Sequence, residues 1–408
     1  MLTVLRGLER GLAGEAVFEA EFPQLRSMTY LDWAAVGVPP LRSIGAVRAY
    51  LDMLERDPAS AAAGAAQAAA KQEARAALAP ILGCSPDRVV FTGTSTTSAV
   101  QAAVDAVSPS KGDNVVIADM DFPLFYVEAK RLSSRGVEVR VAQNADGDYE
   151  LDQFYELIDR RTKAVMVSSV IWVNGLRLDV AELAKVAHEA GAYVIVDAIQ
   201  QAGALRVEAD RLGLDFVAVG SQKWLMAPYG VGALCVSRRA VEELSPPRPG
   251  YLSLAVKDWD AFWADPSKTP AGWTQVEEGA LKFEYGGTFP PLSLRGLAAS
   301  ASLINELGVE RAEEVVLRLR KALVEELEDL RLEVLSPPEA RKASGIVLFR
   351  VPGGLRENYM AAMRLRSRGV MVSARGAAGV WGIRASVHFP NREEDVEALG
   401  EALRGLRD

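Results

Sequence analysis

Two apolar runs in the middle of the chain end in polar side chains of types that can do chemistry. One run ends at Asp197, and Gln200 follows three residues later. A second run, about twenty residues on, leads into Ser221, Gln222 and Lys223. Short continuous apolar runs separated by helix-like segments are typical of parallel strands, whose carboxyl ends carry ligand sites. These two ends therefore present an acid, an amide, a hydroxyl and a lysine.

An acid and a lysine in this arrangement suit pyridoxal 5′-phosphate (PLP). This cofactor needs a lysine amine, here Lys223, to form a Schiff base with its aldehyde. It also needs a carboxylate, here Asp197, to keep the ring nitrogen protonated so that the ring accepts electrons from a substrate carbanion. The alternative is a capping aspartate and an ordinary surface lysine. The two residues together, at this spacing, favour the PLP site.

The segment that contains Asp197 and Lys223 resembles the class V branch of the fold-type I PLP enzymes. This branch contains cysteine desulfurases, kynureninases and isopenicillin N epimerase. The resemblance covers roughly residues 28–405. It implies an α/β fold of this type, a small α-amino acid as substrate and a homodimer with two shared sites.

Three further segments match positions where this family binds the cofactor. Ser95 and Thr96 precede an amphipathic helix, where hydroxyls and free N–H groups form an anion site. The resemblance assigns them to the phosphate, although in isolation an ordinary helix cap is favoured. Phe122 is expected to stack on the pyridine ring, with a loop phenylalanine in the core as the alternative. Ser221 and Gln222 stand where the family places a phosphate contact.

Four residues are expected to complete the site. Gln200 is assigned to the ring hydroxyl of the cofactor, and Trp172 either walls the substrate pocket or is purely structural. Thr288, after Gly287, resembles the segment that crosses a dimer interface to the neighbouring phosphate, with its register left open by an extra glycine. Arg384 matches the strand residue that holds the substrate α-carboxylate, since a guanidinium offers two parallel N–H donors.

The elements that must position these residues follow from hydrophobic periodicity. Apolar runs alternate with amphipathic helices, which predicts an α/β domain with a largely parallel sheet. The predicted strands are Val89–Thr92, Asn114–Ala118, Glu138–Val141, Ala164–Ser168, Tyr193–Val196, Phe216–Val219 and Gly232–Val236. Residues 41–83 are predicted to be helical, including the alanine-rich part, because alanine favours helix. Residues 245–288, rich in Pro, Trp and Gly, are predicted to form long ordered loops.

The 408 residues exceed what one small core requires, and we predict three parts. Residues 1–27 form an N-terminal helix and connector that packs on the small domain. Residues 28–290 form the large PLP-binding domain. Residues 291–408 form a smaller α+β domain.

Composition excludes several classes of protein. A net charge of −8 argues against nucleic acid as a partner, and no apolar stretch reaches the length of a membrane span. The first residues lack a signal-peptide pattern, so a cytoplasmic location is expected. Two cysteines and two histidines disfavour a disulfide scaffold, a metal site and histidine-based catalysis. His188 is expected to be structural, and His388 is a secondary candidate for the site.

The reaction type depends on a small-domain segment, residues 373–379. Desulfurases carry a nucleophilic cysteine there, whereas this segment has none, and neither Cys84 nor Cys235 can replace it. We therefore expect an aminotransferase in which Lys223 removes the α-proton through an amine of lowered pKa. The alternatives are a cysteine or cystine carbon–sulfur lyase, a desulfurase-like enzyme and an amino-acid epimerase. A non-catalytic binding module with the same fold is the alternative from another class.

Overall fold

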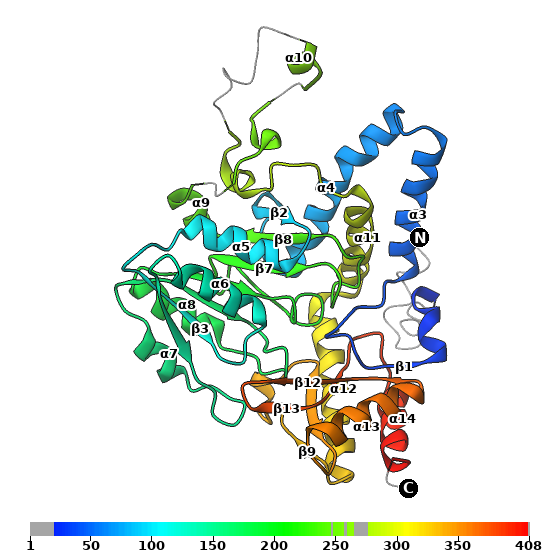
Figure 1. Cartoon of the computed structure of the whole chain (residues 1–408). Coiled ribbons are helices and arrows are strands. Elements are labelled where there is room, and N and C mark those ends of the chain that lie inside the picture. The colour runs from blue at the N-terminus through cyan, green and yellow to red at the C-terminus, as the bar shows by residue number, and fades with distance from the viewer. Residues whose placement is uncertain (1–19, 246–247, 257–258, 265–275, 407–408) are drawn as a thin grey trace.

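The large domain is built on a seven-stranded sheet with the strand order β2-β8-β7-β6-β5-β3-β4. The computed structural model describes residues 20–245, 248–256, 259–264 and 276–406 (Figure 1). All strands run parallel except β8, which is antiparallel to both neighbours. The strands are β2 (Val89–Gly93), β3 (Asn114–Ala118), β4 (Glu138–Ala142), β5 (Thr162–Ser168), β6 (Tyr193–Asp197), β7 (Phe216–Gly220) and β8 (Gly232–Val236). All seven predicted strands are confirmed to within a few residues.

Helices cover both faces of this sheet, so the central strands read as unbroken apolar runs rather than alternating ones. Every residue of β3, β6, β7 and β8 is buried. The helices α5 (Thr96–Val107) and α6 (Pro123–Ser133) pack on one face, within one apolar cluster. The helices α7 (Leu151–Leu157) and α8 (Val180–Glu189) pack on the other face, within a second cluster.

Two long helices near the start of the chain project from the sheet, as Figure 1 shows. They are α3 (Leu41–Arg56) and α4 (Ala61–Leu82), which confirms the helical prediction for the alanine-rich stretch. The Ser60 side chain caps α4 by accepting from the Ala63 N–H at 3.1 Å. The helix α11 (Pro291–Leu307) lies against both, and Ser43 Oγ donates to the Gly296 carbonyl at 2.9 Å. The start of the predicted small domain therefore packs on the large one.

The small domain carries a four-stranded antiparallel sheet with the order β12-β13-β10-β9. Its elements are α12 (Val309–Asp329), β9 (Glu333–Val334), β10 (Ile346–Arg350), α13 (Leu355–Ser367), β11 (Val370–Met371), β12 (Ser373–Ala377), β13 (Val380–Ser386) and α14 (Glu393–Arg404). Near the N-terminus, β1 (Thr29–Tyr30) pairs in parallel with β11. The chain thus enters the large domain from the small one.

The small-domain segment 373–379, where desulfurases carry their cysteine, makes β12 and its turn. The strand β12 pairs with β13 along its whole length. Gly376, Ala377 and Ala378 have no strand preference of their own, and pairing with β13 overrides that weak local signal.

The remaining connections contain short helices. These are η1 (Pro23–Ser27), η2 (Pro86–Arg88), α9 (Arg238–Glu243), η3 (Tyr251–Ser253), α10 (Trp259–Ala264), η5 (Gly279–Phe283) and η6 (Ala340–Lys342). The predicted N-terminal helix over residues 1–19 lies outside the described residues. Residues 246–247, 257–258 and 265–275 of the predicted loops do so as well.

A tight backbone contact joins the N-terminal segment to the loop after β7. The Gly37 N–H donates to the Gln222 carbonyl at 2.7 Å. A Cβ atom on Gly37 would lie 1.9 Å from the Lys223 carbonyl oxygen. Only glycine allows this approach. The segment after β1 therefore lies directly against the residue expected to be catalytic.

We expect Gly37→Ala to lower the free energy of unfolding by about 1–3 kcal/mol, because the added methyl group displaces the Lys223 backbone. The matched control is Gly45→Ala in α3, where a Cβ meets no atom within 4 Å. That change should be neutral or stabilise by about 0.5–1 kcal/mol. Urea denaturation followed by circular dichroism measures both. Equal stability of the two variants would contradict the contact.

Candidate active site

The carboxyl ends of β2, β3, β5, β6 and β7 meet at one edge of the large sheet and enclose a cavity of about 120 Å³. Eight of the eleven predicted site residues line it. The lining comprises Ser95, Thr96, Thr97, Phe122, Leu124, Ser168, Trp172, Asp197, Ile199, Gln200, Gln222 and Lys223. The convergence follows from the topology, since parallel strands end at the same edge.

One end of the cavity is formed by the N-terminus of α5. Ser95 caps this helix: its Oγ accepts from the Ser98 N–H at 3.3 Å, and the Ser98 hydroxyl accepts from the Ser95 N–H at 3.2 Å. Thr96 is buried, and its hydroxyl has no hydrogen-bond partner among the described residues. Free donors at a helix N-terminus favour an anion. Ser95 thus fulfils the capping alternative, while the Thr96 hydroxyl remains available to a phosphate.

Asp197 is the buried acid of the cavity. Its Oδ1 accepts from the Ile199 N–H at 2.8 Å. Burial raises its pKa to about 6, and the Ile199 N–H and the Lys223 amine oppose that rise. A buried carboxylate with so little compensation suits a cationic N–H in the cavity.

The Gln200 side chain is held by two hydrogen bonds beside this acid. Its Oε1 accepts from Trp224 Nε1 at 2.7 Å, and its Nε2 donates to the Ala34 carbonyl at 3.1 Å. The bond from Trp224 fixes which end of the amide is the nitrogen. One N–H of the amide then remains for a ligand in the cavity.

Lys223 and two aromatic rings form the opposite wall. Burial lowers the pKa of the Lys223 amine to about 8, and the Asp197 carboxylate partly opposes this shift. The Lys223 Nζ lies 5.6 Å from the centroid of the Phe122 ring. Phe122 packs edge-on against Trp172 with centroids 5.7 Å apart, and 41% of its side chain is exposed. A flat apolar face therefore stands beside the amine.

Three predicted site residues lie outside this cavity. Ser221 is buried, and its hydroxyl donates to the Pro228 carbonyl at 2.5 Å. Thr288 is exposed, and its hydroxyl lies 3.2 Å from the Tyr251 hydroxyl. Arg384 is buried on β13 and donates from Nη1 to the Trp172 carbonyl at 2.7 Å. Arg384 therefore lies directly behind a cavity residue, whereas Ser221 and Thr288 do not contact the cavity of this chain.

Asp32 was not anticipated as part of the site. It is buried, its Oδ1 lies 3.6 Å from Arg384 Nη2, and its Oδ2 accepts from the Ser373 hydroxyl at 2.6 Å. Burial lowers the pKa of Arg384 to about 10, and the Asp32 carboxylate opposes that shift. The signal in the sequence was a charge inside an apolar segment, which requires a partner.

Asp121 is a second acid that sequence reasoning missed. Both of its oxygens accept from the Ser168 N–H, at 3.1 and 3.2 Å, which joins the ends of β3 and β5. Burial raises the pKa of Asp121 to about 7, and the hydrogen bonds from Ser168 oppose that rise. Its position directly before Phe122 was the available signal. Asp121 therefore fixes the start of the aromatic wall.

Neither histidine lines the cavity. His388 is buried, with Nε2 at 2.9 Å from the Trp224 carbonyl, and His188 Nε2 lies 2.8 Å from Asp215 Oδ2. Within the part of the chain that is described, no group of three or more His, Cys, Asp or Glu residues could hold a metal ion. Among the same residues, no helix has the length and apolar composition needed to cross a membrane.

The cavity residues fit PLP. Two buried donors that line it, Thr96 Oγ1 and Trp172 Nε1, have no partner among the described residues, as expected where a polar ligand belongs. The helix N-terminus suits the phosphate, the Phe122 face suits the ring, and Asp197 suits a protonated ring nitrogen. The Lys223 amine suits the aldehyde.

Known proteins resemble this chain over most of its length. The family model described as aminotransferase class V matches residues 29–399. A probable cysteine desulfurase of Methanothermobacter thermautotrophicus is 26% identical over 402 residues, covering 95% of this chain and 96% of the relative. The cysteine desulfurase of Haloferax volcanii is 28% identical over 426 residues, covering 98% of this chain and 95% of the relative.

Solved structures confirm the predicted fold class. A cysteine desulfurase from Thermococcus onnurineus NA1 superposes with a TM-score of 0.83 at 24% identity, covering 96% of this chain and 97% of that one. The cystine C–S lyase C-DES superposes with a TM-score of 0.83 at 24% identity, covering 94% of this chain and 98% of that one. At this level of identity the likeness concerns the fold.

We expect the Lys223 amine of the cofactor-free protein to titrate near pH 8. Asp197→Asn should move the midpoint to lower pH, because the carboxylate that favours the charged amine is removed. Reductive methylation at a series of pH values, read by peptide mass spectrometry, measures this. Exposed Lys321 in the same digest is the internal reference. A higher midpoint in Asp197→Asn would contradict the assigned interaction.

Proposed function

This chain belongs to the class V aminotransferase family of PLP-dependent enzymes, and from that premise we propose that it is a carbon–sulfur lyase acting on cysteine or cystine. The observation that carries the proposal is a cavity with the amine and acid of a PLP site but without a thiol. The relatives are named cysteine desulfurases, which favours the carbon–sulfur alternative over the aminotransferase that we placed first from sequence.

The positions of the two cysteines argue for elimination rather than sulfur transfer to the protein. Cys84 follows α4, and Cys235 lies on β8. Gly232, which begins β8, packs against the Ser95 carbonyl at the site edge. Cys235 lies three residues further, about 10 Å away at about 3.4 Å per residue. Sulfur that leaves a substrate therefore meets no protein thiol among the described residues of the cavity and passes to solution.

Three cavity residues have a defined task in this proposal. Bound PLP supplies an aldehyde for the lysine amine and a ring that withdraws electrons from the substrate α-carbon. Lys223 accepts the α-proton, since an amine with a pKa of about 8 is partly neutral near pH 7–8. Asp197 holds a proton on the ring nitrogen by its negative charge. Phe122 offers its exposed face to the ring.

Arg384 is proposed to bind the substrate α-carboxylate. Its Nε has no hydrogen-bond partner among the described residues, and its Nη2 is 3.6 Å from Asp32. Donors of this guanidinium therefore remain for a carboxylate. Asp32 acts as a positioning residue, because it holds the guanidinium from the side of β1. The free Trp172 Nε1 is a further donor for substrate within the cavity.

We also propose that the enzyme is a homodimer. Five aromatic side chains from segments around the site are 41–62% exposed, namely Phe122, Tyr126, Tyr229, Tyr251 and Tyr285. Aromatic residues are enriched at protein interfaces. Thr288 adjoins Tyr251 on that surface and lies outside the cavity of its own chain. This position supports the predicted contact with the cofactor of a second subunit.

The proposed reaction is tested by incubating the holoenzyme with cystine, cysteine and other amino acids. We expect pyruvate, ammonia and sulfide from cysteine, and pyruvate, ammonia and cysteine persulfide from cystine, without conversion of the cofactor to pyridoxamine phosphate. Lys223→Ala should lower turnover by at least about 10²–10⁴-fold, since it removes the acid–base group. Stoichiometric pyridoxamine phosphate, reversed by a 2-oxo acid, would instead establish an aminotransferase. Loss of optical rotation alone would establish an epimerase.

Asp32→Asn tests how the carboxylate is held. We expect the affinity for cysteine to fall about tenfold, because Arg384 loses the charge that orients it. Cysteamine, which lacks the carboxylate, should bind as before. Titration of the cofactor absorption in the holoenzyme measures both. Ser373→Ala, which removes one hydrogen bond to Asp32, should give a smaller change in the same direction. Equal weakening for both ligands would contradict this role.

A further inference from the structure

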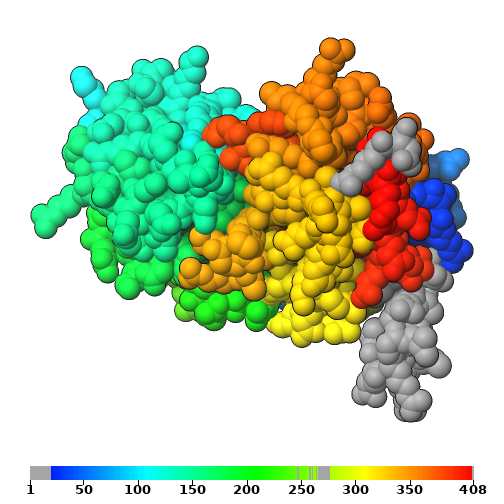
Figure 2. Space-filling model, turned by 90° about the horizontal axis from the view of Figure 1, so that it is seen from below, coloured from blue at the N-terminus to red at the C-terminus, as the bar shows by residue number. Residues whose placement is uncertain are grey.

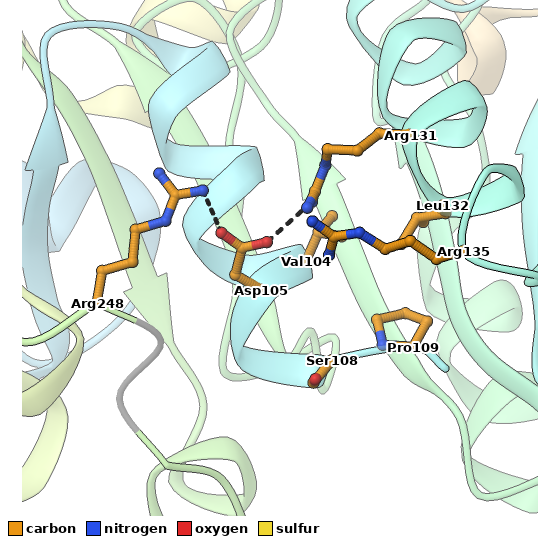
Figure 3. A pocket seen from close by; sticks show the side chains of 8 residues that line it. All are labelled: Val104, Asp105, Ser108, Pro109, Arg131, Leu132, Arg135 and Arg248. Atoms are coloured by element: carbon orange, nitrogen blue, oxygen red, sulfur yellow. Dashed lines mark hydrogen bonds and ion pairs between the residues drawn. The ribbon is translucent and has the colours of Figure 1, made fainter. Parts of the chain in front are cut away.

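A second cavity lies at the end of α5 opposite to the active site (Figure 3). It measures about 350 Å³ and shares no lining residue with the catalytic cavity. Its lining comprises Val104, Asp105, Ser108, Pro109, Arg131, Leu132, Arg135 and Arg248. The active site uses the N-terminus of α5, and this cavity uses its C-terminus. The 12 residues of α5 separate the two by about 18 Å.

Three guanidinium groups converge on this cavity. Figure 3 shows Arg131 and Arg135 reaching in from one side and Arg248 from the other, with Asp105 between them. Asp105 forms ion pairs with Arg131, at 2.9 Å, and with Arg248. Arg131 also pairs with the buried Glu128 at 2.7 Å. Two carboxylates thus face three guanidiniums.

Arg135 is the cavity arginine whose positive charge no carboxylate of the described residues pairs with. Its side chain makes no hydrogen bond or ion pair with any described residue, although Asp105 is close by in Figure 3. Arg131 lies four residues before it in the sequence, and both side chains reach the same cavity. Like charges whose side chains reach the same cavity repel each other. An anion between them would relieve that repulsion.

We propose that this cavity binds a phosphate group. Guanidiniums that approach from different sides match the several oxygens of a tetrahedral oxyanion, and each can donate two parallel N–H bonds. The Ser108 hydroxyl adds a donor at the rim, where Figure 3 places it. Val104, Pro109 and Leu132 are buried and form an apolar floor beside the charges. The ligand is a free phosphate ion or the phosphate of a small phosphorylated molecule.

Helix electrostatics is the competing explanation for these arginines. The last turns of α5 and α6 carry partial negative charge and attract cations. This effect accounts for arginines at helix ends, but it does not require that three of them surround one cavity, as Arg131 and the exposed Arg135 and Arg248 do. The two explanations differ in one measurable property, which is the binding of an anion.

The experiment uses holoenzyme in which borohydride has fixed the cofactor to the protein, so that the phosphate site at α5 stays occupied. Calorimetric titrations with inorganic phosphate, with a phosphomonoester and with acetate are compared. Arg135→Gln should weaken phosphate binding about tenfold, the effect of one charged hydrogen-bonding group. The matched control is Arg56→Gln, an exposed arginine in the last turn of α3, which should leave binding unchanged.

The possible results separate the explanations. Phosphate binding that weakens about tenfold in Arg135→Gln and is unchanged in Arg56→Gln supports the site. A phosphomonoester that binds more tightly than inorganic phosphate identifies a phosphorylated small molecule, and equal affinities identify the free ion. Undetectable phosphate binding, equal affinity in Arg135→Gln, or acetate that binds as well as phosphate would each overturn the proposal. None of these results depends on which reaction the active site performs.

Discussion

The structure depends on a buried carboxylate, Asp197, that the protein only partly compensates through the Lys223 amine and one backbone N–H. Asp197 ends the central strand β6, is enclosed on all sides, and receives one backbone N–H at 2.8 Å. A charge in such a place is costly unless a partner arrives, and burial accordingly raises its pKa to about 6. In the proposed function, the partner is the protonated ring nitrogen of PLP. On that proposal, the ends of the neighbouring strands are arranged around a cation that comes with the cofactor.

A chain of hydrogen bonds couples this edge to the small domain. Gln200 donates to the Ala34 carbonyl, and the Ala34 N–H donates to the Ser386 hydroxyl on β13 at 3.0 Å. Arg384 lies two residues earlier on the same strand, held between the Trp172 carbonyl and Asp32. The segment between β1 and α3 therefore links the cofactor side of the site to the proposed carboxylate side. In Figure 2 the C-terminal elements, orange and red, lie directly against the large domain. A shift of one domain relative to the other would therefore move residues on both the cofactor side and the proposed carboxylate side of the site.

Much of this arrangement could be predicted because the central strands are buried on both faces. Their apolar runs stand out in the sequence, and the residues that follow them must meet at one edge. Asp197 and Lys223 were found in this way, and the resemblance to the family added Phe122. Other features depend on contacts between distant segments. Asp32 could not be assigned to the site from local sequence, because its partner Arg384 lies more than 350 residues later in the chain. Ser221 is turned away from the cavity because the loop that returns at Pro228 takes its hydroxyl, and no local pattern indicates that.

The outcome of the reaction is decided by what the cavity lacks as much as by what it contains. In the proposed function, the proton that Lys223 takes from the α-carbon could return to that carbon, or a group on the β-carbon could leave. Elimination competes best when the β-substituent is a good leaving group, as the sulfur of cystine is. A second acid–base group or a protein thiol would open other routes. Phe122 and Trp172, which stand beside the Lys223 amine, can exchange no proton with the substrate carbon. On the proposed function, an amino acid with a sulfur leaving group would meet one base, Lys223, and the rings of Phe122 and Trp172, and this arrangement supports the proposal of carbon–sulfur cleavage.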